Sequence, residues 1–176
     1  VGQNAESWGL FIMSNGVLNA AGFRIANGGT GIVEHVGGTI NVGGTFDMNN
    51  RNTDFSDSLY RIRGGTLNVG TNAGDIILGN ETFAGSVARF EMLGGEVNAN
   101  RNVLVGSLQD SQGFMTISNG ALNVGGAMQV GISGTGRVDQ AGGSVTIGQY
   151  LEIASGNALA GFGTYRMTGG TLVVGT

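Results

Sequence analysis

The chain has 176 residues and a formal net charge of −4, and 36 of its residues are Gly, against a usual share of about 7%. Pro, Cys and Lys are absent, which excludes collagen, disulfide scaffolds and thiolate metal sites. The acidic balance argues against nucleic-acid binding, no apolar run reaches the ~18 residues of a membrane helix, and 40% hydrophobic residues argue against disorder.

The predicted elements begin with three short segments in which apolar and polar residues alternate, at 11–13, 17–20 and 23–25. The same three segments return at 33–35, 39–42 and 46–48. Alternation with a period of two predicts strands that bury one face, and the Gly-rich links between them predict tight corners. The sequence therefore predicts a repeating unit of three strands.

The unit recurs along the whole chain. First segments follow at 60–62, 90–92, 115–117, 138–140 and 165–167, and third segments follow at 76–78, 103–105, 128–130 and 151–153. Each second segment is preceded by Gly-Gly or Asn-Gly, whose second glycines are Gly16, Gly38, Gly65, Gly95, Gly120, Gly143 and Gly170, 22 to 30 residues apart. A constant core with uneven spacing predicts a loop of variable length between a third segment and the next first segment.

One such turn cannot bury its inward apolar side chains alone, but turns stacked at ~4.8 Å pair through their backbones and bury them in columns. We therefore expect an all-β protein: a three-sided parallel β-solenoid (β-helix) of about seven coils with uncapped ends. Residues 1–176 would form a single domain, or a segment of a longer solenoid. The absence of Pro fits, because nearly every residue of a coil must donate a backbone hydrogen bond.

Stacking predicts two outward ladders on the surface. One places Arg61 between Glu34 and Glu91, and further along it places Asp139 beside Arg166. Opposite charges on neighbouring strands stabilise a register by ~0.2–1 kcal/mol per pair. The other ladder consists of amide side chains that would hydrogen-bond along the axis, Asn19, Asn41, Asn68, Asn98 and Asn123.

The string at Gly64–Gly70, Gly-Gly-Thr-Leu-Asn-Val-Gly, resembles the β-solenoid repeats of bacterial autotransporter passengers and of secreted surface proteins. The pattern at Gly163–Gly170 resembles them as well. The resemblance spans essentially the whole chain. It implies an extracellular or cell-surface location and a scaffold or adhesive role.

Few residues point to site chemistry. His35 is the single His, occupies an inward position and lacks companion ligands, so we expect it to pack in the core. Asp47, Asp54 and Asp57 flank the longest loop and could bind Ca²⁺ through hard oxygen ligands, although the calcium-roll spacing is missing. Arg51 with Asp54 and Asp57 is the best local constellation for catalysis, and without a second cluster we expect no enzyme activity and no cofactor.

The two end coils carry no recognisable cap, and Val1-Gly2 matches the close of a third segment. Such open edges invite strand addition. We expect a structural subunit that stacks head to tail on itself into an extracellular fibre, without membrane insertion. The terminal residues of this polymer interface would be Val1, Phe11, Met13, Leu18, Tyr165, Met167, Leu172 and Val174. The alternative is a segment of a bacterial surface adhesin that binds glycans or other cells.

Overall fold

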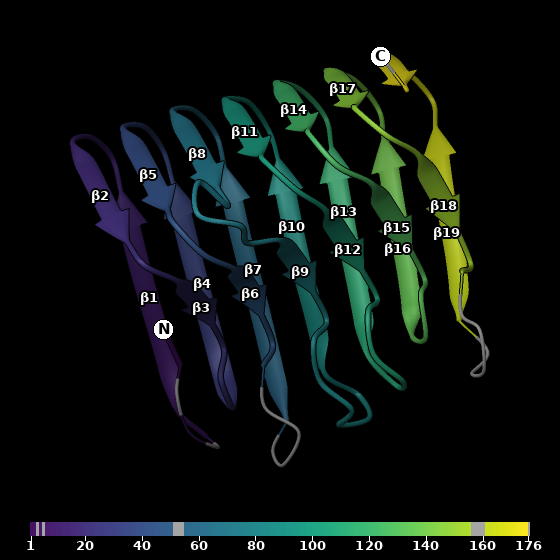
Figure 1. The fold of residues 1–176 in the computed structure, drawn as a ribbon. Helices are drawn as coiled ribbons and strands as arrows, with labels where there is room; N and C mark the ends of the chain where they lie inside the picture. The colour runs from purple at the N-terminus through teal and green to yellow at the C-terminus, as the bar shows by residue number, and fades with distance from the viewer. Residues whose placement is uncertain (3, 5, 51–54, 156–160, 176) are drawn as a thin grey trace.

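A computed structural model describes residues 1–2, 4, 6–50, 55–155 and 161–175. The described residues contain 20 strands and no helix, and all the strands pair in parallel in three sheets. Figure 1 shows the resulting β-solenoid, in which each turn stacks beside the next from the N-terminus to the C-terminus. The predicted fold class is therefore confirmed.

Each turn contributes one strand to each sheet, in the order first, second, third. The first sheet contains β1 (Trp8–Met13), β4 (Gly29–His35), β7 (Ser56–Ile62), β10 (Val87–Met92), β13 (Gln112–Ile117), β16 (Thr135–Gln140) and β19 (Phe162–Met167). The second sheet contains β2 (Val17–Ala20), β5 (Thr39–Val42), β8 (Thr66–Val69), β11 (Glu96–Ala99), β14 (Ala121–Val124), β17 (Ser144–Ile147) and β20 (Thr171–Val174).

The third sheet contains β3 (Phe23–Ile25), β6 (Phe46–Met48), β9 (Ile76–Leu78), β12 (Val103–Val105), β15 (Met128–Val130) and β18 (Leu151–Ile153). It has six strands where the other two sheets have seven. The described chain therefore makes six complete turns. After them, β19 adds a seventh strand to the first sheet and β20 adds a seventh strand to the second.

The strands of the first sheet are longer than predicted. The apolar alternation marks only 33–35 in the second turn, whereas β4 begins at Gly29. Thr30 and Gly31 pair with Trp8 and Gly9 of the preceding strand. Small and polar residues interrupt the hydrophobic pattern there, but their backbones still complete the parallel ladder.

The core lies inside the three sheets and consists of inward columns of apolar side chains. In the middle turns these side chains are completely buried, as for Ile62, Leu67 and Leu78. An aromatic cluster occupies the N-terminal part of this core, where Phe46 contacts Phe23, Tyr60 and Phe90. The core therefore has no single centre and extends along the axis of the rod.

Glycines make two features of this cross-section possible. The seven anchoring glycines before the second-sheet strands all have positive φ, between 68° and 91°. A separate column of small residues, called here the closing column, lies at the corner between the third and first sheets. At this corner the end of a third-sheet strand packs on the start of a neighbouring first-sheet strand. The column consists of Gly9, Gly31, Ser58, Ala88, Gly113, Gly136 and Gly163. A Cβ at Gly136 would collide with the carbonyl oxygen of Val105 and the amide nitrogen of Gly131.

Candidate functional site

The two ends of the stack are the first candidate site. At the N-terminal edge, β1 and β2 each have one strand neighbour, and at the C-terminal edge the same holds for β18, β19 and β20. Among the described residues, each edge therefore presents strands with one unpaired side. Such a backbone edge can accept an additional strand.

The predicted interface residues lie at these edges. Phe11 and Met13 belong to β1, and Leu18 belongs to β2. At the other end, Tyr165 and Met167 belong to β19, and Leu172 and Val174 belong to β20. All seven occupy inward columns, because they align in register with buried core residues of the adjacent turns.

Exposure shows that the core is open at the C-terminal edge. Met167 is 44% exposed and Val174 is 42% exposed, whereas their counterparts Met92 and Val124 in the middle turns are 0% and 2% exposed. An inward apolar side chain that loses its covering turn leaves its surface in water, and covering it again would be favourable.

Val1 lies at the third-sheet position of the N-terminal edge. Its carbonyl oxygen accepts a hydrogen bond from the amide of Ala26 at 2.7 Å, and the carbonyl of Val130 accepts the equivalent bond from Ala154 at 2.8 Å. Val1 therefore takes the place that the last residue of a third-sheet strand holds in a complete turn.

The amide ladder runs along the outer face of the second sheet. Asn41 donates to Asn19 at 2.8 Å, Asn68 to Asn41 at 2.8 Å, Asn98 to Asn68 at 3.0 Å and Asn123 to Asn98 at 2.9 Å. In all four bonds the donating N–H thus points toward the N-terminal edge. The ladder gives the outer surface a direction along the axis.

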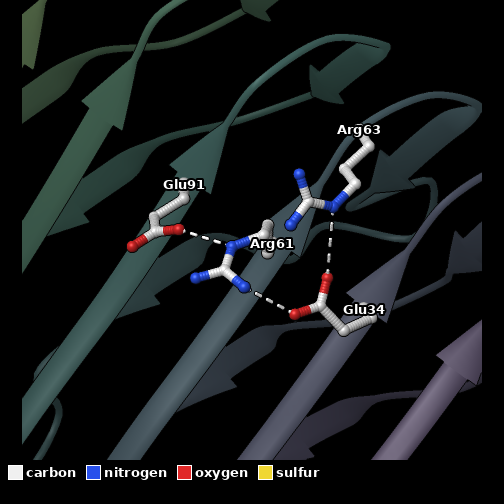
Figure 2. Close-up of polar contacts among 4 residues, drawn as sticks. All are labelled: Glu34, Arg61, Arg63 and Glu91. Carbon is white, nitrogen blue, oxygen red and sulfur yellow. Dashed lines mark hydrogen bonds and ion pairs between the residues drawn. The ribbon is translucent and has the colours of Figure 1, made fainter.

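The charged ladder lies on the outer face of the first sheet (Figure 2). Arg61 donates from Nε to Glu91 at 2.6 Å and from Nη1 to Glu34 at 2.7 Å, so one guanidinium links three turns. Arg63 adds a longer contact of 3.6 Å to Glu34. The hydrogen bond that Arg61 donates to Glu91, together with the charges of both carboxylates, raises the pKa of Arg61.

The second expected charge pair is only partly as predicted. The register does place Asp139 opposite Arg166. The carboxylate of Asp139, however, accepts two hydrogen bonds from Arg137, two residues earlier on the same strand, at 2.6 and 3.0 Å. Both side chains lie on the outer face of β16, and their proximity along the strand provides a partner without any contact between turns.

His35 is fully buried, as predicted for a core His. Its Nε2 lies 3.2 Å from the carbonyl oxygen of Gly38 and its Nδ1 lies 2.7 Å from the hydroxyl of Tyr60. A carbonyl only accepts, so Nε2 carries the proton and the Tyr60 hydroxyl donates to Nδ1. Burial lowers the pKa of His35, so the neutral ring is favoured.

The same arrangement recurs near the other end of the rod, and the sequence reasoning missed it. Gln140 accepts a hydrogen bond from the hydroxyl of Tyr165 at 2.7 Å and donates to the carbonyls of Thr171 at 3.0 Å and Gly143 at 3.5 Å. The signal in the sequence is the spacing, since each Tyr follows its polar partner by 25 residues. His35 and Gln140 are thus each paired with the Tyr of the next turn.

The proposed calcium ligands lie on different sheets. Asp47, on β6, is nearly buried and accepts hydrogen bonds from the amides of Asn50 and Asn80, while Asp57, on β7, accepts one from Arg89 at 2.6 Å. Asp54 and Arg51 lie outside the described residues. No group of three or more His, Asp or Glu side chains suited to a metal ion is found in the part of the chain that the structure describes. Calcium binding stays a prediction.

Asp47 borders a cavity of about 600 Å³ on the outer side of the third sheet. Burial raises the pKa of Asp47 to about 6, opposed by the hydrogen bond from Asn80 and the charge of Arg24. The cavity is lined by Gly22, Phe23, Arg24, Thr45, Asp47, Ile77 and Asn80. Since the Asp47 carboxylate already accepts from two amides, it serves the packing of turns two and three.

No protein-family model matches the chain, and neither a curated protein nor a solved structure matches it. The described residues also include no helix that is long and apolar enough to cross a membrane.

Proposed function

We propose that this chain is a structural subunit that stacks head to tail on further copies of itself and builds an extracellular fibre. The observation that carries the proposal is the pair of open edges, each with unpaired parallel strands and an inward core that is incompletely covered. Addition of a turn from another copy would pair the strands and bury the apolar residues together.

The two edges match in the chemistry of their inward side chains. In a stack that continues the spiral, β19 of one copy lies beside β1 of the next, so that Tyr165 meets Phe11 and Met167 meets Met13. In the second sheet, β20 lies beside β2, so that Leu172 meets Leu18. These inward columns then continue across the junction with apolar side chains, which make up most of each column within the chain.

Such a contact joins two different surfaces and leaves both outer edges of the pair open. Heterologous contacts of this kind do not close when the added unit continues along an axis, and they therefore produce filaments. Rods that grow along their own axis would support a scaffold role, with no catalysis required. The likeness of Gly64–Gly70 to passenger repeats supports an extracellular or cell-surface setting.

A charge at the C-terminal edge tests the proposal. We expect the purified chain to form unbranched filaments in electron microscopy and to sediment as large species, and Val174→Lys to remain a short rod. Val174 is 42% exposed at the open edge, so Lys is tolerated in the single copy but would bury an unpaired charge at a junction. Val36→Lys, at a corner away from both edges and 48% exposed, is the matched control and should assemble normally. Short monodisperse rods of the native chain at every concentration would contradict the proposal.

The adhesin alternative draws on the loops between the third and first sheets. These connections vary in length, with β9 ending at Leu78 before β10 begins at Val87, but β15 ending at Val130 before β16 begins at Thr135. Figure 1 shows that the β9–β10, β12–β13 and β15–β16 connections lie on the same side of the rod. Binding on a glycan array that is lost when residues 79–86 are replaced by the shorter connection 131–134 would favour adhesion over fibre formation.

A further inference from the structure

The first sheet carries an outward column whose composition changes at both ends. This column consists of the first residues that align in register across the seven strands: Trp8, Thr30, Asp57, Val87, Gln112, Thr135 and Phe162. Its five inner members are polar or aliphatic, whereas the member at each edge is aromatic. Trp8 is 64% exposed and Phe162 is 65% exposed.

We propose that Trp8 and Phe162 are the residues that select a single register at the head-to-tail junction between two copies. This inference rests on the proposed function and adds the identity of the contact that fixes how the copies align. In the register that continues the spiral, β19 lies one strand spacing of ~4.8 Å from β1, and Phe162 is directly opposite Trp8. Aromatic side chains directly opposite on neighbouring strands attract each other beyond the area they bury.

The neighbouring columns agree with the same register. The closing column of small residues ends in Gly9 at one edge and Gly163 at the other, so that this register places two glycines together at a crowded corner. Val1 would then continue the inward third-sheet column between Ile25 of its own chain and Ile153 of the other copy. In the single chain, Ile153 is 45% exposed.

A shift of one residue along the strands would undo these matches. It would turn the inward residues of β19 toward the outer face of the neighbouring column, because side chains alternate with a period of two. A shift of two residues keeps the faces but places Phe162 opposite Leu10 or leaves it beyond the end of β1, and it separates the two glycines. The aromatic pair therefore distinguishes the continuing register from the shift that preserves the faces.

Cysteine cross-linking tests the register directly, since the chain contains no Cys of its own. Ile12 and Arg166 face each other in the continuing register, and the strand spacing is within the Cα separation that a disulfide accepts. Filaments of Ile12→Cys/Arg166→Cys should therefore form a ladder of covalent oligomers on oxidation. Leu10→Cys/Arg166→Cys, which requires the two-residue shift, should not. The two positions of each pair lie at opposite ends of one rod, so only a contact between copies can join them.

Substitution of the aromatic pair tests its contribution. Trp8→Thr and Phe162→Thr introduce the residue that Thr30 and Thr135 provide in the same column. Each should raise the concentration needed for filament growth about threefold to tenfold. Val87→Thr, in the middle of the column, is the control and should leave it unchanged. Trp8 is the only Trp, and its fluorescence should shift to shorter wavelength on assembly.

The outcomes separate the two proposals. Filaments that cross-link through residues 10 and 166 would overturn the register and leave the fibre proposal intact. Filaments that grow equally well when both aromatic residues are replaced would overturn their role in selecting the register, and would also leave the fibre proposal intact. A native chain that forms no filaments, judged by sedimentation and microscopy alone, would overturn the fibre and with it the register. Cross-linking through residues 12 and 166 together with weakened growth of both threonine variants would support both.

Discussion

At the scale of single residues, two polar side chains inside the core are accommodated by the same device. His35 and Gln140 each connect a Tyr hydroxyl of the following turn to a carbonyl of their own corner. Burial raises the pKa of Tyr165 to about 12 and raises that of Tyr60 as well, so both hydroxyls remain protonated donors. A buried polar group that is fully hydrogen-bonded costs little stability, and the arrangement ties two turns together.

The His35 contact predicts a pH dependence of stability. Burial lowers the pKa of His35 below 6.5 in the folded chain. As the pH falls, His35 is therefore protonated at a higher pH in the unfolded chain than in the folded chain. The contribution of His35 to the free energy of unfolding is therefore fully present above about pH 6.5 and is lost as the pH falls below that value. The free energy of unfolding changes by at most ~1.4 kcal/mol per pH unit through this group. His35→Gln should keep the contacts, as Gln140 does, and remove this slope in urea unfolding between pH 8 and pH 5.

The comparison isolates His35 from Asp47. The folded-state pKa of Asp47 is raised to about 6, so the pH dependence that it gives to the free energy of unfolding has the opposite sign. Its stabilising contribution is lost as the pH rises through that value. Asp47 is common to both proteins, so it cancels in the difference between them. An identical pH slope in the native chain and in His35→Gln would contradict the assignment.

At the scale of strands, ladders and corners hold the turns in register. Arg61 links three neighbouring strands of the first sheet, and the Asn side chains link five of the second. Each exposed charge pair contributes only ~0.2–1 kcal/mol, so the ladders select the register more than they stabilise the fold. The corner between the third and first sheets depends on small residues, which the hydrophobic pattern does not reveal.

The closing column predicts a large effect of a small substitution. Gly136→Ala would place a methyl group against the backbone of Val105 and Gly131, neither of which can move without breaking the ladder. We expect it to destabilise the chain by about 1–3 kcal/mol, the usual cost of overpacking, and to lower the thermal midpoint. At Gly22, where a Cβ would be 3.6 Å from its nearest neighbour, Ala should be tolerated. Equal midpoints for the two variants would contradict this account of the corner.

At the scale of the whole molecule, stability arises from contacts between adjacent turns. Strands contact their neighbours in the same sheet, and residues far apart along the axis do not meet. The rod is therefore modular, and its length is set by the number of turns. The same modularity leaves both ends chemically similar to an internal junction, which is why the edges dominate the proposed function.

Modularity predicts which deletions fold. Removal of residues 87–111 takes out one full turn and brings β7 next to β13 in an unchanged register, because Val87 and Gln112 are aligned. This variant should keep its β-sheet signal in circular dichroism and unfold at a somewhat lower temperature. Removal of residues 87–99 deletes β10 and β11 but keeps β12, so two third-sheet strands follow one another and the chain should not fold. Loss of structure in the full-turn deletion would contradict the modular account.

The sequence by itself determined the solenoid, the three strands of each turn and the side-chain columns, because alternation and regular Gly corners are local signals that every turn repeats. The predicted register of Arg61 with Glu34 and Glu91 followed from the same repetition. Only the tertiary structure decided which polar atoms meet: Asp139 bonds to Arg137 rather than Arg166, Asp47 and Asp57 lie on separate sheets, and His35 reaches Tyr60. The contact of Asp139 depends on side-chain rotamers, and that of His35 depends on the stacking of two turns. The alternation of apolar and polar residues determines neither of them.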